Sequence, residues 1–340
     1  MMTPKPLNDS DVLDKISRYP TPEWQRFGDH NWQPSDLSDG LYQAMIDIGD
    51  GIELCVEAGG NPNHPPLLMI MGLGSQMIFW PNSFVQRLID AGFFVIRFDN
   101  RDIGLSSKVQ IEGLPRVNQL KMMLRMQTGL SNKNVPVAYN LTDMAEDTAR
   151  LIKALQLGRT HLIGASMGGM IAQILAARYP NIVERIALMF TTTNRAFLRP
   201  PRPKQLYTLI NRPESHSERD IIRHSVWFIK TVGTPGHINM RMVRDVAKLR
   251  YKRNFHPLGT LQQLNAILSS GSIARFSKRV KAPTIVMHGS VDGLLPSSQG
   301  QVVAKTIPNA TFHLIEGMGH DIPAYYQPHM VNLITNHLLK

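Results

Sequence analysis

The sequence predicts an α/β protein in which a mainly parallel, doubly wound sheet of eight strands carries an inserted helical cap. Short apolar runs typical of buried strands alternate with segments long enough to form a helix, which is the pattern of βαβ units. In addition, about ninety residues between the apolar runs 186–190 and 284–288 contain no strand pattern. With 340 residues, 43% of them hydrophobic, the chain is long enough to bury a core of this kind.

The expected sheet starts with a hairpin and continues with buried strands. Alternating runs at 43–48 and 52–58 are joined at Gly49-Asp50-Gly51, and an Asp-Gly between two such runs is a hairpin signal. The next run, 67–71, is continuously apolar, as expected for a strand that is covered on both faces. The remaining strands are expected at 93–98, 162–164, 186–190, 284–288 and 311–315.

Helical patterns fill the segments between the strands. In the strand-free segment, Ile222, Val226 and Ile229 recur at helical spacing after a stiff, proline-rich stretch at 199–203. Outside that segment, helices are expected near 84–91, 141–157, 170–179, 298–306 and 328–339. The predicted parts are an N-terminal extension outside the sheet (1–42), a core (43–194 and 282–340) and a helical cap (195–281).

Two apolar features are interpreted as parts of the core rather than of a site. Met122, Met123 and Met126 recur at helical spacing, and a methionine stripe of this kind usually packs inward, although a flap over an apolar pocket is the alternative. Cys55 is the single cysteine, which excludes a disulfide framework, and no neighbouring residue marks its thiol for activation.

The stretch Gly164-Ala165-Ser166-Met167-Gly168 carries the strongest chemical signal. It lies between the apolar run 160–163 and a helix-forming run that stops at Pro180. A Gly-x-Ser-x-Gly in this position is typical of a nucleophile elbow, a turn so tight that the positions two before and two after the serine hold almost no side chain. The following helix points its amides and its positive dipole end at the same spot. Ser166 is therefore the candidate nucleophile.

A nucleophilic serine needs a base and a group that orients the base. In a fold with such an elbow, the chain order is serine, acid, histidine, each after a strand. Asp292 follows the expected strand 284–288, and His320 follows the expected strand 311–315. The loop after 186–190 reads Thr-Thr-Thr-Asn and offers no acid, whereas His288 and His313 fall inside strands. The predicted catalytic residues are Ser166, Asp292 and His320.

Backbone amides are expected to stabilise the negative charge that develops in acyl transfer. Gly72-Leu73-Gly74 follows the third expected strand, so the amides of Leu73 and Met167 are the predicted oxyanion hole. No His-Glu-x-x-His and no paired cysteine favour a metal site. The glycines of 72–74 lack the Gly-x-Gly-x-x-Gly spacing of a dinucleotide site. Neither a metal nor a cofactor is expected.

Over residues 43 to 340 the chain resembles the α/β-hydrolases, and within them the aclacinomycin methylesterase-like esterases. The resemblance is carried by 71–74 with Trp80-Pro81, by Val95–Ser106, by the elbow, and by the loops around Asp292 and His320. Asp99, Arg101, Gly104 and Ser106 match a segment that the family uses to turn the chain after the fourth strand. Met71 stands where many members have histidine, and the N-terminal extension has no counterpart in shorter members. The substrate in the family name is not transferred.

The predicted function is that of a serine hydrolase, an esterase or lipase, which cleaves a small-molecule carboxylic ester with an apolar acyl or alcohol part. A carbon–carbon bond hydrolase, a thioesterase or a perhydrolase would show the same three residues and stays an alternative. A ligand receptor without turnover is the alternative from another class, and the complete set of catalytic residues argues against it.

The net charge of +11 comes from one region. Residues 195–281 contain 18 Lys or Arg and four acidic residues, a net of +14. The favoured interpretation is a solvated helical surface, and the sharper hypothesis is attraction to acidic esters or an anionic membrane. No motif indicates nucleic-acid binding. The N-terminus has no apolar signal-peptide core and no run reaches membrane-span length, so a cytoplasmic location is expected.

Overall fold

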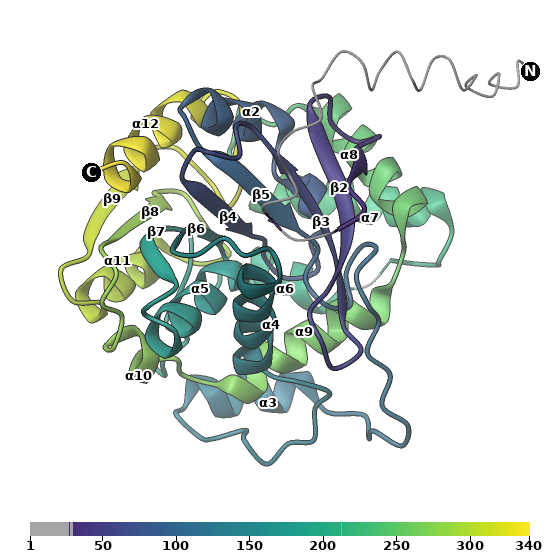
Figure 1. The fold of residues 1–340 in the computed structure, drawn as a ribbon. Helices are drawn as coiled ribbons and strands as arrows, with labels where there is room; N and C mark the ends of the chain where they lie inside the picture. The colour runs from purple at the N-terminus through teal and green to yellow at the C-terminus, as the bar shows by residue number, and fades with distance from the viewer. Residues whose placement is uncertain (1–26, 28–29, 212) are drawn as a thin grey trace, which may run out of the picture.

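The computed structural model describes residue 27, residues 30–211 and residues 213–340, and its nine strands form one sheet with helices on both faces (Figure 1). The strands are β1 (Gln33–Pro34), β2 (Leu41–Asp47), β3 (Glu53–Gly59), β4 (Pro66–Ile70), β5 (Phe94–Phe98), β6 (Thr160–Ala165), β7 (Val183–Met189), β8 (Thr284–Gly289) and β9 (Thr311–Ile315). Their order across the sheet is β1-β2-β3-β5-β4-β6-β7-β8-β9. The pairs from β5 to β9 are parallel, and those from β1 through β3 to β5 are antiparallel. The predicted fold class is confirmed.

The first strand corrects both the predicted count of eight strands and the prediction that residues 1–42 lie outside the sheet. Gln33 and Pro34 pair with Gln43 and Tyr42 of β2. The proline is tolerated because β1 is an edge strand, where a missing amide need not break the sheet. Two residues are too few to produce an alternating pattern, so the sequence does not reveal this strand. Most of the predicted extension, residues 1–26 and 28–29, lies outside the described residues.

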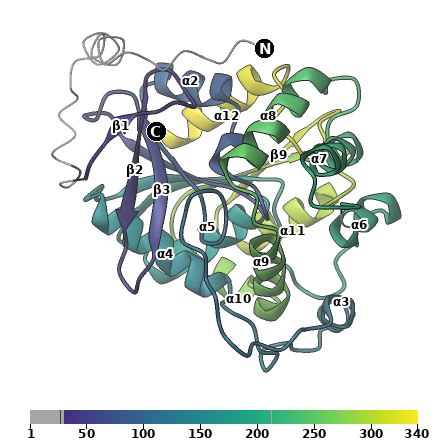
Figure 2. The ribbon, with the colours of Figure 1, turned by 90° about the vertical axis from the view of Figure 1, so that its right-hand side faces the viewer.

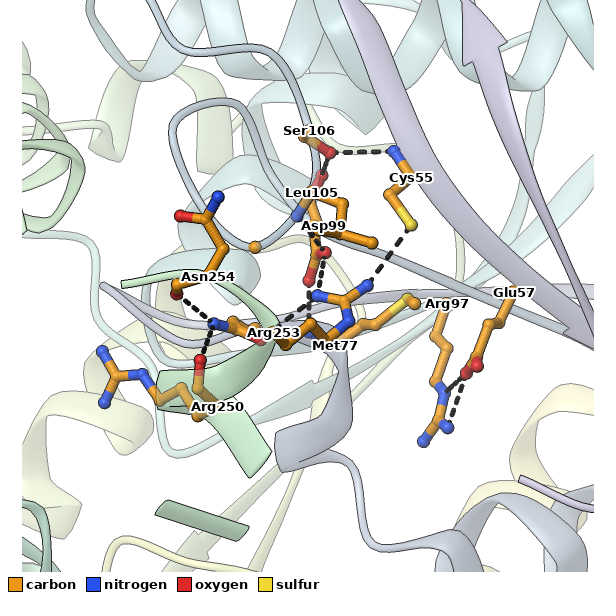
Figure 3. A network of polar contacts seen from close by, with 12 residues as sticks. Cys55, Glu57, Met77, Arg97, Asp99, Leu105, Ser106, Arg250, Arg253 and Asn254 are labelled. Carbon is orange, nitrogen blue, oxygen red and sulfur yellow. Dashed lines mark hydrogen bonds and ion pairs between the residues drawn. The ribbon is translucent and has the colours of Figure 1, made fainter. Parts of the chain in front are cut away.

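The chain just before β2 also completes a buried ion pair. Arg97 of β5 lies opposite Glu57 of β3, and its guanidinium is 2.6 Å from Glu57 Oε2 (Figure 3). Buried charges destabilise a fold unless their remaining polar atoms are also satisfied. Arg97 Nη2 donates to Ser38 Oγ at 2.7 Å, and Ser35 Oγ donates to Glu57. Residues 35–38 therefore belong to the folded domain.

Two helical layers cover the sheet, which explains why its central strands are apolar along their length. Apolar side chains of α2 (Asn82–Asp90) and α12 (Gln327–Leu338) pack on one face. Those of α4 (Leu141–Ala154), α5 (Met167–Arg178) and α11 (Ser297–Thr306) pack on the other face. Every residue of β5 and β6 is buried. Because the strands from β5 to β9 run in the same direction, their carboxyl ends meet at one edge of the sheet, where binding sites of such folds lie.

The segment between β7 and β8 forms helices and no strand in its described residues, as the missing strand pattern predicts. These helices are α6 (Pro203–Ile210), α7 (Glu218–Val232), α8 (Met240–Arg253), α9 (Pro257–Ser270) and α10 (Ala274–Ser277). The helices α7 and α8 pack against each other, α9 packs on α4 and on α3 (Gln119–Gln127), and α10 packs on α5 (Figure 2). Because α10 contacts the core directly, the cap boundaries 195–281 stay a prediction. Among the described residues, no helix is long and apolar enough to cross a bilayer.

Candidate active site

Ser166 lies in a strained turn between β6 and α5, with φ of 54° and ψ of −118°. A Cβ on Gly164 would lie 2.6 Å from the carbonyl oxygen of Gly168, and a Cβ on Gly168 would lie 2.0 Å from that of Ile70. Both distances are too short for a side chain, so this backbone requires glycine at both positions. Thr191 Oγ1 donates to the carbonyl oxygen of Ser166 at 2.6 Å and supports the turn from the end of β7. A residue held at positive φ in this way is a candidate for function.

The three residues predicted to be catalytic form one chain of hydrogen bonds. His320 Nε2 is 3.1 Å from Ser166 Oγ, and His320 Nδ1 is 2.7 Å from Asp292 Oδ2. Asp292 comes from the loop after β8 and His320 from the loop after β9. The ring of Phe190, at the end of β7, lies against the ring of His320 with 4.7 Å between the centroids. Four neighbouring strands thus deliver these groups to the same edge of the sheet.

Asp292 is placed to remain ionised. Its Oδ1 accepts hydrogen bonds from the amides of Leu294 and Leu295, both at 2.9 Å. Burial by itself raises the pKa of this carboxyl, but the charge of His320 and hydrogen bonds from His288 and His320 outweigh burial and hold the pKa well below its usual range. A carboxylate in this state can orient the His320 ring and stabilise its positive charge.

His288 is a contact of Asp292 that the sequence reasoning misses. This histidine is fully buried near the end of β8, and its Nε2 lies 2.7 Å from the carbonyl oxygen of Leu295 and 3.3 Å from Asp292 Oδ2. The sequence signal was the four-residue spacing between His288 and Asp292. The apolar pattern of a strand contains no information on the path of the next loop, and it is this loop that brings Asp292 back to His288.

Asp321 lies next to His320 in sequence, but its carboxylate accepts its hydrogen bonds from Thr234. Asp321 Oδ1 accepts hydrogen bonds from the amide of Thr234 at 3.0 Å and from its hydroxyl at 2.5 Å. The amide of Gly319 donates to Thr234 Oγ1 at 2.9 Å, and the amide of His320 donates to the carbonyl oxygen of Val232 at 2.8 Å. The end of α7 therefore holds the loop that carries His320.

The loop that carries Leu73 passes beside Ser166. A Cβ on Gly72 would lie 3.1 Å from Ser166 Cβ, while Met167 is the first residue of α5. Within the described part of the chain, neither the Leu73 amide nor the Met167 amide donates to another protein group. Both amides are therefore available to an oxygen bound at Ser166, and their role in an oxyanion hole stays a prediction.

Helices α8 and α9 fix the residue that follows Leu73. The amide of Gly74 donates to Gln263 Oε1 at 2.9 Å, and its carbonyl oxygen accepts from Arg250 Nη2 at 2.8 Å. Gln76 Nε2 in turn donates to the carbonyl oxygen of Arg250 at 3.0 Å. The orientation of the loop beside Ser166 thus depends on residues more than 170 positions later in the chain.

Arg253, the last residue of α8, extends into the core and forms a buried ion pair there (Figure 3). Its Nη1 is 2.5 Å from Asp99 Oδ2, and its Nη2 is 3.3 Å from Cys55 Sγ. Asp99 Oδ1 also accepts from the amide of Met77 at 2.8 Å. Burial raises the pKa of Asp99, whereas Arg253 and the Met77 amide act to lower it. Burial also raises the pKa of the Cys55 thiol to about 12, in keeping with an unreactive core cysteine.

Residues 65–324 match the sequence profile of the alpha/beta hydrolase fold. The chain belongs to the alpha/beta hydrolase fold family. Rhodomycin D methylesterase DnrP of Streptomyces peucetius is 25% identical to this alpha/beta hydrolase over 305 residues, which cover 82% of this chain and 93% of that one. A poly(3-hydroxyalkanoate) depolymerase of Ectopseudomonas oleovorans is 28% identical over 264 residues, which cover 77% and 80%. The predicted resemblance to α/β-hydrolases and methylesterases is confirmed.

A solved structure supports the same fold. The 2-hydroxy-6-oxo-6-phenylhexa-2,4-dienoate hydrolase of Rhodococcus sp. strain RHA1 superposes on this hydrolase with a TM-score of 0.66. The superposition covers 88% of this chain and 99% of that one at 17% identity. At this identity the likeness concerns the fold alone.

Two hollows of this alpha/beta hydrolase are lined by residues other than Ser166. One, of about 500 Å³, lies between α3 and residues 131–135, and the other, of about 320 Å³, lies beside the start of α4. None of Ser166, Asp292 and His320 lines either hollow. Within the described residues, no three His, Cys, Asp or Glu side chains are grouped so that they could hold a metal ion.

Replacing Arg253 by methionine is expected to destabilise this hydrolase by about 3–5 kcal/mol, because the substitution leaves the Asp99 carboxylate buried without its partner. The measurement is the midpoint of urea unfolding, followed by tryptophan fluorescence. Arg223→Met is the matched control, since the Arg223 side chain is exposed and pairs with the exposed Glu214 and with Asp220, and pairs at the surface contribute little. Equal midpoints for the two variants would contradict a stabilising role of the buried pair.

Proposed function

We propose that this protein is a serine hydrolase that cleaves carboxylic esters through an acyl-enzyme. The observation that carries the proposal is the hydrogen-bonded chain from Ser166 through His320 to Asp292, with the serine in a strained turn. The names of two relatives, a methylesterase and a poly(3-hydroxyalkanoate) depolymerase, support the ester class.

In the first half of the reaction, Ser166 Oγ attacks the ester carbonyl carbon while His320 Nε2 accepts its proton. Asp292 stabilises the imidazolium that forms, because its carboxylate stays ionised and accepts a hydrogen bond from His320 Nδ1–H. The oxygen of the tetrahedral intermediate binds the amides of Leu73 and Met167. His320 then gives its proton to the alkoxide oxygen as the carbon–oxygen bond breaks, and the alcohol leaves.

In the second half, water replaces the alcohol. His320 Nε2 takes a proton from the water while its oxygen attacks the acyl carbon, and the same two amides bind the new oxyanion. Collapse of this intermediate breaks the bond to Ser166 Oγ, which regains its proton from His320. The carboxylic acid is released and the starting state is restored.

The substrate we propose is a small-molecule ester with an apolar acyl or alcohol part. The ring of Phe190 lies against His320, and Gly72, the residue before Leu73, comes close to Ser166 Cβ. Apolar groups at the nucleophile favour an apolar substituent on the ester, since both surfaces leave water on binding.

The test is a series of p-nitrophenyl esters of increasing acyl length, with the Ser166→Ala protein as the blank. We expect saturable release of p-nitrophenol by the wild type and only the background rate with the variant. Cleavage of thioesters or carbon–carbon bonds without cleavage of any ester would replace the ester by one of the other bonds. Binding of esters without turnover would favour a receptor instead.

A further inference from the structure

One corner of the molecule exposes large apolar side chains. On α3, Leu120 and Leu124 lie one turn apart and are 68% and 66% exposed. Leu130 is 57% exposed, and Phe197, after β7, is 80% exposed. Single exposed apolar side chains are common on protein surfaces, but a group of large ones at one place marks an interaction surface. These four residues are called the apolar corner below.

The apolar corner is assembled from two segments that are distant in sequence. The amide of Phe197 donates to the carbonyl oxygen of Gln127 at 3.1 Å, and Gln127 Nε2 donates to that of Leu198 at 2.7 Å. The other face of α3 is anchored, because Met122 is buried and Gln119 Nε2 donates to Asn265 Oδ1 at 3.1 Å. This packing leaves the leucines of α3 outward. Figure 2 shows α3 at the lower margin of the molecule.

Phe197 is held in a conformation that bulky residues rarely adopt. Its φ is 60°, in the left-handed region. Neither the backbone strain nor the exposure of the ring stabilises the isolated chain. Because this residue is strained and also presents an aromatic ring to solvent, we infer a binding role for it.

The two segments that form the apolar corner carry charges of one sign. Residues 114–139 and 195–210 contain no Asp or Glu. They contain Arg116, Lys121, Arg125, Lys133, Arg195, Arg199, Arg202 and Lys204. All of these except Arg125 are exposed, and no ion pair among the described residues uses any of them. Apolar side chains surrounded by unpaired cations complement an anionic lipid surface, which offers both acyl chains and negative headgroups.

We propose that the apolar corner is a docking surface for an anionic lipid membrane, on which the protein lies without spanning it. The leucines and Phe197 enter the boundary between headgroups and acyl chains, and the surrounding Lys and Arg bind the headgroups. The sequence suggested only that the basic segment 195–281 is attracted to an anionic membrane, whereas the apolar corner names the side chains that would bind it. It does not depend on the activity of Ser166.

Two other partners fit the corner less well. A second copy docked through the same face would bring the same cations against each other, since a two-fold interface pairs a surface with itself. A nucleic acid would neutralise the cations but would leave four large apolar side chains in water. Only a membrane uses both properties.

The experiment measures co-sedimentation of the full chain with vesicles of phosphatidylcholine alone and of phosphatidylcholine mixed equally with phosphatidylglycerol. We expect binding to the mixed vesicles that weakens with salt, because salt screens the attraction between the cations and the headgroups. Leu124→Ser and Phe197→Ser should each bind at least about tenfold more weakly, since each removes apolar surface that leaves water on binding. Leu339→Ser is the matched control, because Leu339 is exposed at the far end of the chain. The Ser166→Ala protein should bind like the wild type.

Several results would overturn the proposal. These are equal binding to neutral and mixed vesicles, full binding by both corner variants, and an equal loss in Leu339→Ser. A dimer that disappears in the corner variants, or retention on a DNA duplex but not on vesicles, would assign the corner to another partner. Unchanged thermal midpoints of the variants establish that a loss of binding is not a loss of folding.

Discussion

The Ser166→Ala protein is expected to hydrolyse esters with a kcat several orders of magnitude below that of the wild type. Where such catalytic groups act as a unit, the loss of one lowers kcat by up to about 10⁶. The reason is that alanine offers no oxygen to attack the carbonyl carbon or to carry the acyl group. His320→Ala should lose a similar factor, because Ser166 then has no base within 3.1 Å. The measurement is kcat for the best ester of the acyl series, with the thermal midpoint as a check on folding.

The Ser166→Ala/His320→Ala protein separates a shared role from two independent ones. Because both residues serve the same proton transfer, the double variant should be about as slow as either single variant. A double variant far slower than both would argue against a shared role. Turnover like the wild type in Ser166→Ala would end the proposed mechanism.

The Asp292→Asn protein is expected to lose about 10⁴ in kcat with its backbone fold unchanged. An amide in place of the carboxylate presents no negative charge to His320 and no longer selects the ring tautomer that leaves Nε2 free to accept a proton. The loss should appear in kcat measured at saturating ester, because the interaction strengthens as the imidazolium forms.

Asp321→Asn is the control for the acid. Its Oδ1 accepts from Thr234, and an amide oxygen can still accept those bonds, so most of the activity should remain. If Asp321→Asn were the inactive variant and Asp292→Asn retained turnover, the acid would be assigned to the wrong residue.

The fold could be predicted because its main signals are local. A strand buried on both faces must be apolar along its length, so runs such as 67–71 are visible in the sequence. The pair β1–β2 could not be predicted, since a two-residue strand has no pattern and depends on its neighbour for its hydrogen bonds. The buried ion pair of Arg97 could not be predicted either, because its partner Glu57 lies on another strand and the apolar run around Arg97 does not indicate it.

The residues proposed as catalytic could be found because the constraint on them is also local. Each follows a strand, and the Gly-x-Ser-x-Gly spacing is a local signal, although the contact that requires Gly168 is with Ile70 of the neighbouring strand β4. His288 was missed because its contact with Asp292 depends on the path of a loop. Gln263 and Arg253 were missed because their partners, Gly74 and Asp99, lie more than 150 positions away.

The sequence by itself determined the alternation of strands and helices, the strained serine turn and the chain order of Ser166, Asp292 and His320. These follow from steric and periodic rules that act over short stretches of chain. Only the tertiary structure decided which side chains hold the loop at Leu73, which carboxylate Arg253 meets, and that the leucines of α3 share a corner with Phe197. Such contacts depend on how distant segments pack, and local pattern contains no record of the partner that will cover, or leave open, a given face.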